Sequence, residues 1–462
     1  MRTSPYAFLA AVLATVPALL PAAPAATPAC GIVPYGCEAW MVVHDGGRHE
    51  VAPRILAANG RVFVGSIQDA KAAVNAYDST MGVRLWNISY ADESGPEPHA
   101  LAASPNGDQV FVIGTGFAGR ITRMFLLAID AEDGAIQWEA HWGLDTDGLD
   151  VWADGSTVYA VGSVRNNYSV VAYDAATGAQ KWASYYDARG GWNPGWRGWS
   201  YDVAFDVAHA GSNLYVTGVS AAPDGLLEYA TLAIDAATGA QLWVARSHGM
   251  NPDGSALRSE AYAVAASTDG SLVYVLGNDG LKAFDAATGE PAPGWSGHED
   301  VARCRAYFPM LNKECLLAPT PDGRALIAMS HTDLAAYDAR TGALLWHEVL
   351  HYGTDTNWSL TRTMVPSPDG SRVYVASPGG REDYVTDTLS SVNEVYETRA
   401  FDAIDGALLW RVTTRGERLA VEGIDVSPDG GHVFVTGEDP YHSNIVTVAY
   451  DTSQTTFPRL PL

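Results

Sequence analysis

One short pattern recurs along almost the whole chain: an aspartate, a glycine four residues later and a tryptophan eight residues later. Its fullest copies span residues 172–182 and 233–243. Complete copies lie at Asp78/Trp86, Asp130/Trp138, Asp174/Trp182, Asp235/Trp243, Asp338/Trp346 and Asp402/Trp410. In a looser copy that begins at Asp285, two prolines displace the tryptophan to Trp295. Because successive motif aspartates are 44 to 64 residues apart, the sequence predicts a repeat architecture rather than several unrelated domains.

A second pattern precedes the first in the repeats. Residues 367–370 and 427–430 both read Ser-Pro-Asp-Gly, and looser copies occur at 104–107 and 267–270. Proline and aspartate favour entry into a tight turn, and glycine supplies its positive φ. The flanking runs are short and rich in β-branched and aromatic residues, as strands prefer. Each unit is therefore predicted to form four strands: A, the Pro-Asp-Gly turn, B, a loop, C, the Asp-x-x-x-Gly turn, and D with the tryptophan.

The two ends of the chain complement each other. After Asp402 the chain makes strands A to C once more and reaches Asp451 without a following tryptophan strand. Residues 38–44 form a tryptophan strand that no Asp-x-x-x-Gly turn precedes. The fold is therefore predicted to be an all-β, eight-bladed β-propeller of four-stranded blades, in which the N-terminal outer strand completes the C-terminal blade. One domain, residues 26–462, would contain all eight blades.

The first 25 residues have the features of a secretory signal peptide. Arg2 supplies a positive charge, residues 7–20 form a short apolar core, and residues 23–25 offer a small-residue cleavage site. The apolar core is too short to span a membrane comfortably. We therefore expect a secreted, extracellular protein that is not inserted into a membrane.

Four cysteines are present, an even number that suits an exported chain. Cys30 lies close to Cys37 in sequence, and Cys304 lies close to Cys315. Two local disulfides are predicted from this spacing, and the first would fix the start of the closing strand. The formal net charge is −25, which repels phosphate backbones and anionic lipid, so nucleic acid is not expected as a partner. We expect a monomer.

The Ala-x-Asp-x-x-Thr-Gly-x-x-x-Trp copies at 172–182 and 233–243 resemble the tryptophan-docking motif of quinoprotein-like (PQQ-like repeat) propellers. That superfamily includes dehydrogenases, assembly scaffolds and many secreted proteins, so the resemblance is specific for fold and not for function. For a dehydrogenase it implies a quinone cofactor (PQQ) and Ca²⁺ at the mouth of the central channel. The chain lacks the adjacent-cysteine pair typical of the alcohol dehydrogenases, and no Glu/Asn/Asp set for the ion can be assigned from the sequence.

The recurring motif residues are interpreted as structural. Each aspartate is expected to accept hydrogen bonds from its own turn, and each tryptophan to pack between blades with a partner for its N–H. The string His-Glu-Val-Leu-His at 347–351 matches a zinc-protease pattern, but it follows Trp346 directly and is predicted to lie on a strand. Four residues along a strand span about 13 Å, too far for two imidazoles to share one zinc ion.

One face of the propeller is expected to be elaborated and the other plain. The A–B and C–D turns are short, whereas the long segments 187–200, 246–260, 296–315 and 377–399 are all B–C or D–A loops. We call the side that carries these loops the elaborated face and the opposite side the plain face. The candidate ligand-binding residues on the elaborated face are Trp192, Trp196, Arg197 and Trp199 in one glycine-rich loop, with Tyr441 and His442 in another. The tryptophans would either stack on a sugar, a flat cofactor or a peptide, or fold down to plug the channel mouth.

Two oxygen-rich segments, 145–150 and 251–254, are either solvated turns or Ca²⁺ loops, and neither has complete EF-hand spacing. No catalytic residue and no metal ligand is assigned, and no cofactor is predicted. The sequence favours a secreted, non-catalytic binding propeller that recognises a protein or glycan through its elaborated face. The alternative is a PQQ-dependent dehydrogenase with quinone and Ca²⁺ at the channel mouth.

Overall fold

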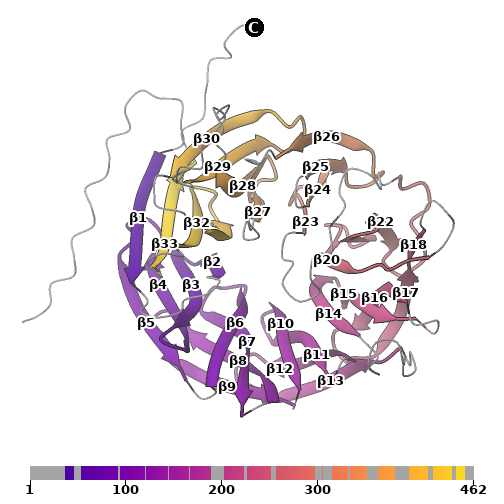
Figure 1. Ribbon diagram of the computed structural model, residues 1–462, viewed down its shortest axis with the longest axis horizontal. Coiled ribbons are helices and arrows are strands. Elements are labelled where there is room, and N and C mark those ends of the chain that lie inside the picture. The colour runs from indigo at the N-terminus through magenta and orange to yellow at the C-terminus, as the bar shows by residue number, and fades with distance from the viewer. Residues whose placement is uncertain are drawn as a thin grey trace, which may run out of the picture.

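The computed structural model shows eight β-sheets arranged as blades around one axis (Figure 1). It describes residues 37–45, 54–91, 94–119, 121–143, 145–165, 167–188, 202–222, 226–250, 256–296, 304, 315–330, 333–350, 363–379, 395–414, 420–439 and 444–452. No helix in these segments is long and apolar enough to cross a membrane. The prediction of an eight-bladed, all-β propeller is confirmed.

The first four blades follow one another along the chain, each in the order A, B, C, D from the axis outward. Their strands are, for blade 1, β2 (Arg54–Ala58), β3 (Arg61–Gln68), β4 (Lys71–Asp78) and β5 (Arg84–Tyr90); for blade 2, β6 (Ser94–Ala103), β7 (Gln109–Ala118), β8 (Ile121–Asp130) and β9 (Ile136–Trp142); for blade 3, β10 (Thr146–Ala153), β11 (Thr157–Val164), β12 (Asn167–Asp174) and β13 (Gln180–Tyr186); and for blade 4, β14 (Val203–Ala210), β15 (Asn213–Ala221), β16 (Leu227–Asp235) and β17 (Gln241–Ser247).

The other four blades complete the ring. Their strands are, for blade 5, β20 (Ala261–Ala266), β21 (Leu272–Gly277) and β22 (Gly280–Asp285); for blade 6, β23 (Leu316–Pro319), β24 (Ala325–Met329), β25 (Asp333–Asp338) and β26 (Leu344–Val349); for blade 7, β27 (Thr363–Pro366), β28 (Arg372–Gly379), β29 (Val395–Asp402) and β30 (Leu408–Thr414); and for blade 8, β31 (Ala420–Val426), β32 (His432–Asp439), β33 (Asn444–Asp451) and β1 (Cys37–Asp45). A small hairpin, β18 (Gly249–Met250) with β19 (Ala256–Leu257), precedes blade 5.

The N-terminal strand closes the ring as predicted. Strand β1 pairs antiparallel with β33, from Cys37 opposite Asp451 to Asp45 opposite Asn444. Figure 1 shows the indigo β1 beside the yellow β33, so the two ends of the chain share one sheet. This pairing covers what would otherwise be an open outer edge on blade 8.

The motif tryptophans join neighbouring blades at the outer part of the ring. In seven seams the indole N–H donates to the carbonyl of the residue after the motif aspartate of the next blade, over 2.8 to 3.2 Å. The pairs are Trp40–Ser79, Trp86–Ala131, Trp138–Ala175, Trp182–Ala236, Trp243–Ala286, Trp295–Ala339 and Trp346–Ala403. We call each such contact, together with the glycine described next, a tryptophan dock.

The motif glycine is required by the same contact. At Gly406, for example, φ is +71°, and a β-carbon would lie 2.7 Å from the Trp346 ring of the preceding blade. The turn aspartates bind their own turns as expected; Asp235 Oδ1 accepts from the N–H of Thr238 at 2.8 Å. The motif therefore fastens blade to blade, which confirms its structural interpretation.

One seam lacks the dock. Trp410 is 2% exposed, and its indole N–H has no hydrogen-bond partner. The equivalent carbonyl, that of Thr452, accepts a hydrogen bond from Arg372 at 3.2 Å instead. The seam between blades 7 and 8 is thus packed, but it is not hydrogen-bonded through its tryptophan.

Blade 5 departs from the prediction of four strands in every blade. Its sheet has three strands, since Pro291 and Pro293 interrupt the region where strand D would run and only Pro291 bridges to Phe284. Proline has no N–H for a ladder, so the fourth strand cannot form there. Trp295 nevertheless reaches its dock on Ala339.

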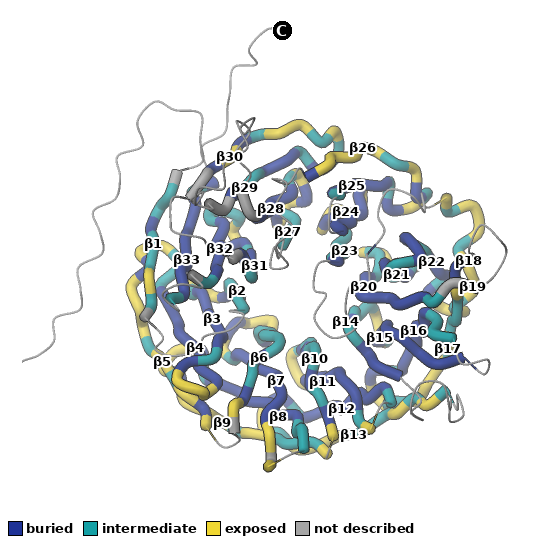
Figure 2. Tube along the Cα trace, viewed as in Figure 1, coloured by how far each residue is buried: buried dark blue, intermediate teal, exposed yellow. Residues whose placement is uncertain are grey.

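The hydrophobic core lies between the blades, where the B and C strands are almost wholly buried (Figure 2). The D strands at the outer rim consist mostly of exposed and partly buried residues, as β5 does. The Pro-Asp-Gly turns form as predicted. In the turn before β28, Gly370 donates its N–H to the Ser367 carbonyl at 2.9 Å and has φ of +73°.

Candidate functional site

The base of the tryptophan-rich loop is held by one buried carboxylate. Asp202 is fully buried and accepts hydrogen bonds from the N–H groups of Ala188, at 3.2 Å, and Ala221, at 3.0 Å. Burial raises the pKa of Asp202, and hydrogen bonds, first of all that from Ser220, oppose the rise. Because Ala188 precedes the 189–201 segment and Asp202 follows it, this carboxylate fixes the two ends of the loop together.

The candidate ligand-binding residues themselves lie outside the described residues. They are Trp192, Trp196, Arg197, Trp199, Tyr441 and His442. The segment 251–254, considered for Ca²⁺, also lies outside them. Their role stays a prediction.

Beside the base of this loop, Arg246 of β17 links blade 3 to blade 4. Its guanidinium donates to Glu228 at 2.9 Å, to the Tyr186 hydroxyl at 2.6 Å and to Ser220 at 2.9 Å. A further bond reaches the Ala221 carbonyl at 2.9 Å. An arginine with this many fixed acceptors acts as a rigid brace, because its planar donors are all directed at protein groups.

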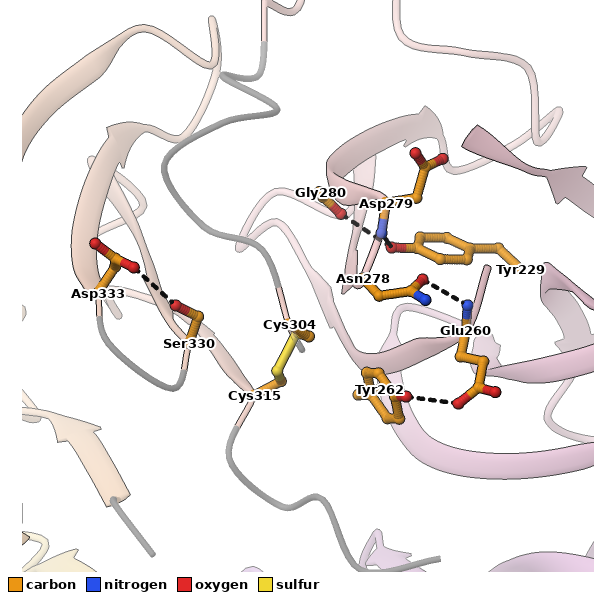
Figure 3. Close-up of a disulfide and its surroundings, with 10 residues drawn as sticks. All are labelled: Tyr229, Glu260, Tyr262, Asn278, Asp279, Gly280, Cys304, Cys315, Ser330 and Asp333. Atoms are coloured by element: carbon orange, nitrogen blue, oxygen red, sulfur yellow. Dashed lines mark hydrogen bonds between the residues drawn. A yellow bond between two sulfur atoms is a disulfide. The ribbon is translucent and has the colours of Figure 1, made fainter. Parts of the chain in front are cut away.

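A second network lies at the start of blade 5 (Figure 3). Glu260 is 1% exposed, and its carboxylate accepts from Arg258 at 2.6 Å and from the Tyr262 hydroxyl at 2.5 Å. The Glu260 N–H donates to Asn278 at 2.8 Å. Both carboxylate oxygens are therefore engaged, which leaves this buried acid paired rather than available to a ligand.

The predicted disulfide between Cys304 and Cys315 is confirmed. The two Cα atoms are 5.9 Å apart, and both cysteines are buried in the core between blades 5 and 6. Figure 3 shows the disulfide near Tyr262, and Cys304 donates its N–H to the Gly277 carbonyl at 3.1 Å. Cys30 and the side chain of Cys37 lie outside the described residues, so the other disulfide remains a prediction.

His347 lies on a strand, as predicted. It is part of β26, and its Nε2 lies 2.7 Å from the Asp333 carboxylate. His351 lies outside the described residues. The strand position and the ion-pair partner both support the view that this string is not a zinc-protease motif.

Three aspartates on the innermost strands form bonds that sequence reasoning missed. Asp150 of β10 accepts from the Val207 N–H of blade 4 at 3.2 Å, and Asp206 of β14 accepts from the Val264 N–H of blade 5 at 2.7 Å. In blade 8, Asp425 of β31 accepts from the Ala57 N–H of blade 1 at 2.7 Å. Each carboxylate also caps the N–H of its own following valine. We call these three contacts the aspartate bridges.

Two carboxyls of the aspartate bridges, those of Asp425 and Asp206, have raised pKa values. Burial raises the pKa of Asp425 to about 6. Burial also raises the pKa of Asp206 well above its usual range, and the adjacent Asp150 carboxylate raises it further. Asp150 and Asp206 both accept from the Val207 N–H, which brings two acids together and favours one shared proton.

The segment 145–150 therefore needs a correction. It was interpreted as a solvated turn or a Ca²⁺ loop, but Thr146–Ala153 is the innermost strand of blade 3 and Asp150 is tied to backbone amides. A usable signal was present: a small residue, an apolar residue, Asp and Val recur at 148–151, 204–207 and 423–426. Likewise 377–399 is not all loop, since β28 extends to Gly379 and β29 begins at Val395.

No set of ligands for the calcium ion that the family resemblance implies can be assigned among the described residues. Ca²⁺ prefers six to eight oxygen ligands. Among the residues that the structure describes, no three His, Cys, Asp or Glu side chains converge where they could hold a metal ion. The Asp150, Asp206 and Asp425 carboxylates on the innermost strands accept hydrogen bonds from backbone N–H groups of the next blade. No chemical step is derived through such a cofactor.

Comparison with known proteins agrees with the fold. A family model described as "Outer membrane protein assembly factor BamB" (PQQ_2) matches residues 35–217, 228–382 and 330–454. No curated protein matches the sequence. Several solved structures are similar in fold at low sequence identity.

Three of these structures show how different the proteins with this similar fold are. Chaetomium thermophilum Sqt1 bound to the N-terminus of the ribosomal protein L10 shares 17% identity with a TM-score of 0.58, over 89% of this chain and 98% of that one. Quinohemoprotein alcohol dehydrogenase from Comamonas testosteroni shares 14% sequence identity with a TM-score of 0.53, and the match covers 92% of this chain and 78% of that one. A europium-containing methanol dehydrogenase shares 14% sequence identity with a TM-score of 0.50, and the match covers 89% of this chain and 93% of that one.

At such identities the likeness concerns the fold alone, and it spans peptide-bound propellers as well as dehydrogenases. The family model, in contrast, covers nearly all of the described chain, from β1 to β33. The tryptophan docks supply the structural basis for that match. The chain therefore belongs to the PQQ-like repeat β-propeller family whose model is described as outer membrane protein assembly factor BamB.

Proposed function

We propose that this protein is a secreted, non-catalytic binding propeller that recognises a protein or glycan through the loops of its elaborated face. The observation that carries the proposal is the fixing of charged side chains at the loop bases. Asp202, Arg246 and Glu260 each bind several protein groups. Such bonds fix the residues at the ends of these loops to a rigid scaffold, and loops over a rigid scaffold are where binding residues are usually presented.

The chemistry of these side chains also favours binding over catalysis. A general base or nucleophile needs an unengaged atom within reach of a substrate. The Glu260 carboxylate and the Arg246 guanidinium are instead engaged by neighbouring side chains and backbone. The family description of an assembly factor and the peptide bound to the similar Sqt1 propeller point the same way, by analogy of fold.

A binding experiment tests the proposal directly. The purified chain would be screened on a glycan array and against purified extracellular proteins. A variant carrying Trp192→Ala, Trp196→Ala and Trp199→Ala would be screened in parallel. The matched control is Met81→Ala, a 59% exposed residue in a C–D turn of the plain face. We expect a ligand that binds the wild type and the control but not the triple variant.

A second arm addresses the dehydrogenase alternative. PQQ and Ca²⁺ would be added to the purified chain, followed by an absorption spectrum and a dye-linked oxidation assay. A bound quinone with turnover would overturn the non-catalytic proposal, and so would equal binding by the wild type and the triple variant. Recovery of a mature chain that begins at Ala26 would support secretion, and retention of residues 1–25 would contradict it.

A further inference from the structure

We propose that the plain face has a binding site for a neutral saccharide in the seam between blades 4 and 5, with His209 as the aromatic side chain of its wall. This site lies on the opposite side of the molecule from the loops considered above. It is a second site and does not depend on them.

The site is a cavity of about 750 Å³. This volume lies within the range of roughly 300–1,000 Å³ that is usual for small-molecule sites. The A–B turn of blade 4, the A–B turn of blade 5 and the start of the C–D turn of blade 5 line it. All three turns belong to the plain face, and their strands β14, β15 and β20 lie side by side in Figure 1.

The neighbouring A–B turns stand apart at this seam. In the seam between blades 6 and 7 they pack closely: a β-carbon on Gly370 of blade 7 would lie 2.8 Å from Asp322 of blade 6. At the equivalent position of blade 5, a β-carbon on Gly270 would lie 3.8 Å from its nearest neighbour, Ala210. Blade 4 has only Gly211 and Ser212 between its A and B strands, in place of a Pro-Asp-Gly turn, so less chain fills the seam.

His209 is the distinctive side chain of the cavity wall. Its ring stacks on the Trp152 indole of blade 3, with centroids 4.0 Å apart and planes 14° from parallel. In the part of the chain that the structure describes, neither ring nitrogen of His209 has a hydrogen-bond partner. Burial lowers the pKa of His209, so the imidazole is neutral at neutral pH and offers one donor and one acceptor.

The other polar groups of the wall select the class of ligand. Ser212, Asn213 and Thr268 are neutral groups able to donate or accept, and no lysine or arginine lines the cavity. The one charged lining group, Asp269, accepts hydrogen bonds from Ser267 and Ser271 of its own turn. Since the chain carries a net charge of −25 and this wall holds no cation, an anion is disfavoured.

A sugar matches these groups best. Its hydroxyls donate and accept, as the neutral wall requires, and its C–H face can pack on an aromatic ring. A fully apolar ligand would remove water from the His209 ring nitrogens without replacing its hydrogen bonds, and this desolvation penalty disfavours apolar binding.

The test compares His209→Phe with His432→Phe. The first keeps a flat ring against Trp152 and removes both nitrogens. The second is a matched control, because His432 also stacks on an aromatic, Phe434, with centroids 6.1 Å apart, but in blade 8. Saturation-transfer NMR and calorimetry would be run with a panel of neutral mono- and disaccharides, and with inorganic phosphate and choline as charged probes.

We expect at least one neutral saccharide to bind the wild type and His432→Phe, and to bind His209→Phe at least tenfold more weakly. Absence of binding by every neutral saccharide would overturn the proposal. Equal binding to all three proteins, or binding of phosphate or choline alone, would also overturn it. Loss of the loop-face ligand in the triple tryptophan variant would not affect this outcome, so the two proposals fail independently.

Discussion

The outer and inner seams between blades are fastened by different chemistry. At the outer part of the ring, seven seams have a tryptophan dock in which an indole covers a glycine and donates to a carbonyl. At the inner strands, the aspartate bridges found among the described residues fasten the seams 3/4, 4/5 and 8/1. The docks contain no titratable group, whereas the bridges depend on a carboxyl. The repeated motif therefore sets the architecture. The inner aspartates do not follow the repeat, and from their carboxyls we expect the stability of the fold to depend on pH.

The largest expected effect comes from removing a dock. Trp346 is 9% exposed and packs between blades 6 and 7, so Trp346→Ala removes a large buried ring and leaves a cavity. We expect the free energy of unfolding to fall by about 3–5 kcal/mol. Urea denaturation followed by fluorescence measures it. Leu242→Ala, at a 50% exposed rim position, is the control and should stay within about 0.5 kcal/mol.

Overfilling the same dock should have the next largest effect. Gly406→Ala would place a β-carbon 2.7 Å from the Trp346 ring at a φ of +71°. We expect a loss of about 2–4 kcal/mol, from overpacking and from the left-handed backbone together. Gly60→Ala separates the two causes, because Gly60 also has a φ of +71° but would meet nothing within 4 Å. Equal losses in the two variants would show that the tryptophan contact contributes nothing.

Most of this architecture could be predicted from the sequence, because the docks recur in seven of the eight seams and are built from the same repeated Asp, Gly and Trp. The missing dock was visible too, since Thr455 stands four residues after Asp451 where the motif has glycine. The aspartate bridges were missed because they occupy only some inner strands, and Asp150 lies in an acidic cluster that suggests a loop. The cavity beside His209 lies at a two-residue A–B turn without the Pro-Asp-Gly pattern, and no sequence motif marks such a gap.

The aspartate bridges should make stability depend on pH. The pKa of Asp425 is raised to about 6, above the value of about 3.9 for an unfolded chain. The fold therefore favours the protonated carboxyl, so its contribution is complete below about pH 4 and is lost as the pH rises through about 6. For this half-buried group we expect a loss of about 1–3 kcal/mol across that window. Asp425→Asn, whose amide oxygen can still accept from Ala57, should remove this part of the slope.

Asp369 serves as a control, because its pKa is lowered whereas that of Asp425 is raised. A hydrogen bond from Ser367 lowers the pKa of Asp369 in an A–B turn. Its contribution is present above the unfolded pKa and is lost as the pH falls. Denaturation midpoints should therefore be measured from below about pH 4 up to pH 7. The difference between Asp369→Asn and the wild type should shrink as the pH falls below about 4, whereas the difference for Asp425→Asn should change as the pH rises from about 4 through 6. If stability depended on pH in the same way in all three proteins, neither carboxyl would contribute the expected pH dependence.

The smallest expected effect isolates the hydrogen bond of the dock. Trp346 donates to the Ala403 carbonyl at 3.1 Å, whereas the Trp410 N–H in the next seam has no partner. Trp→Phe removes the N–H and a similar amount of ring at both positions. Trp346→Phe should therefore destabilise the protein more than Trp410→Phe, by about 0.5–1.5 kcal/mol, because it alone breaks a hydrogen bond and leaves a carbonyl unpaired. Paired urea denaturations measure this difference. A larger loss at Trp410 would mean that packing, and not the N–H bond, sets the strength of each seam.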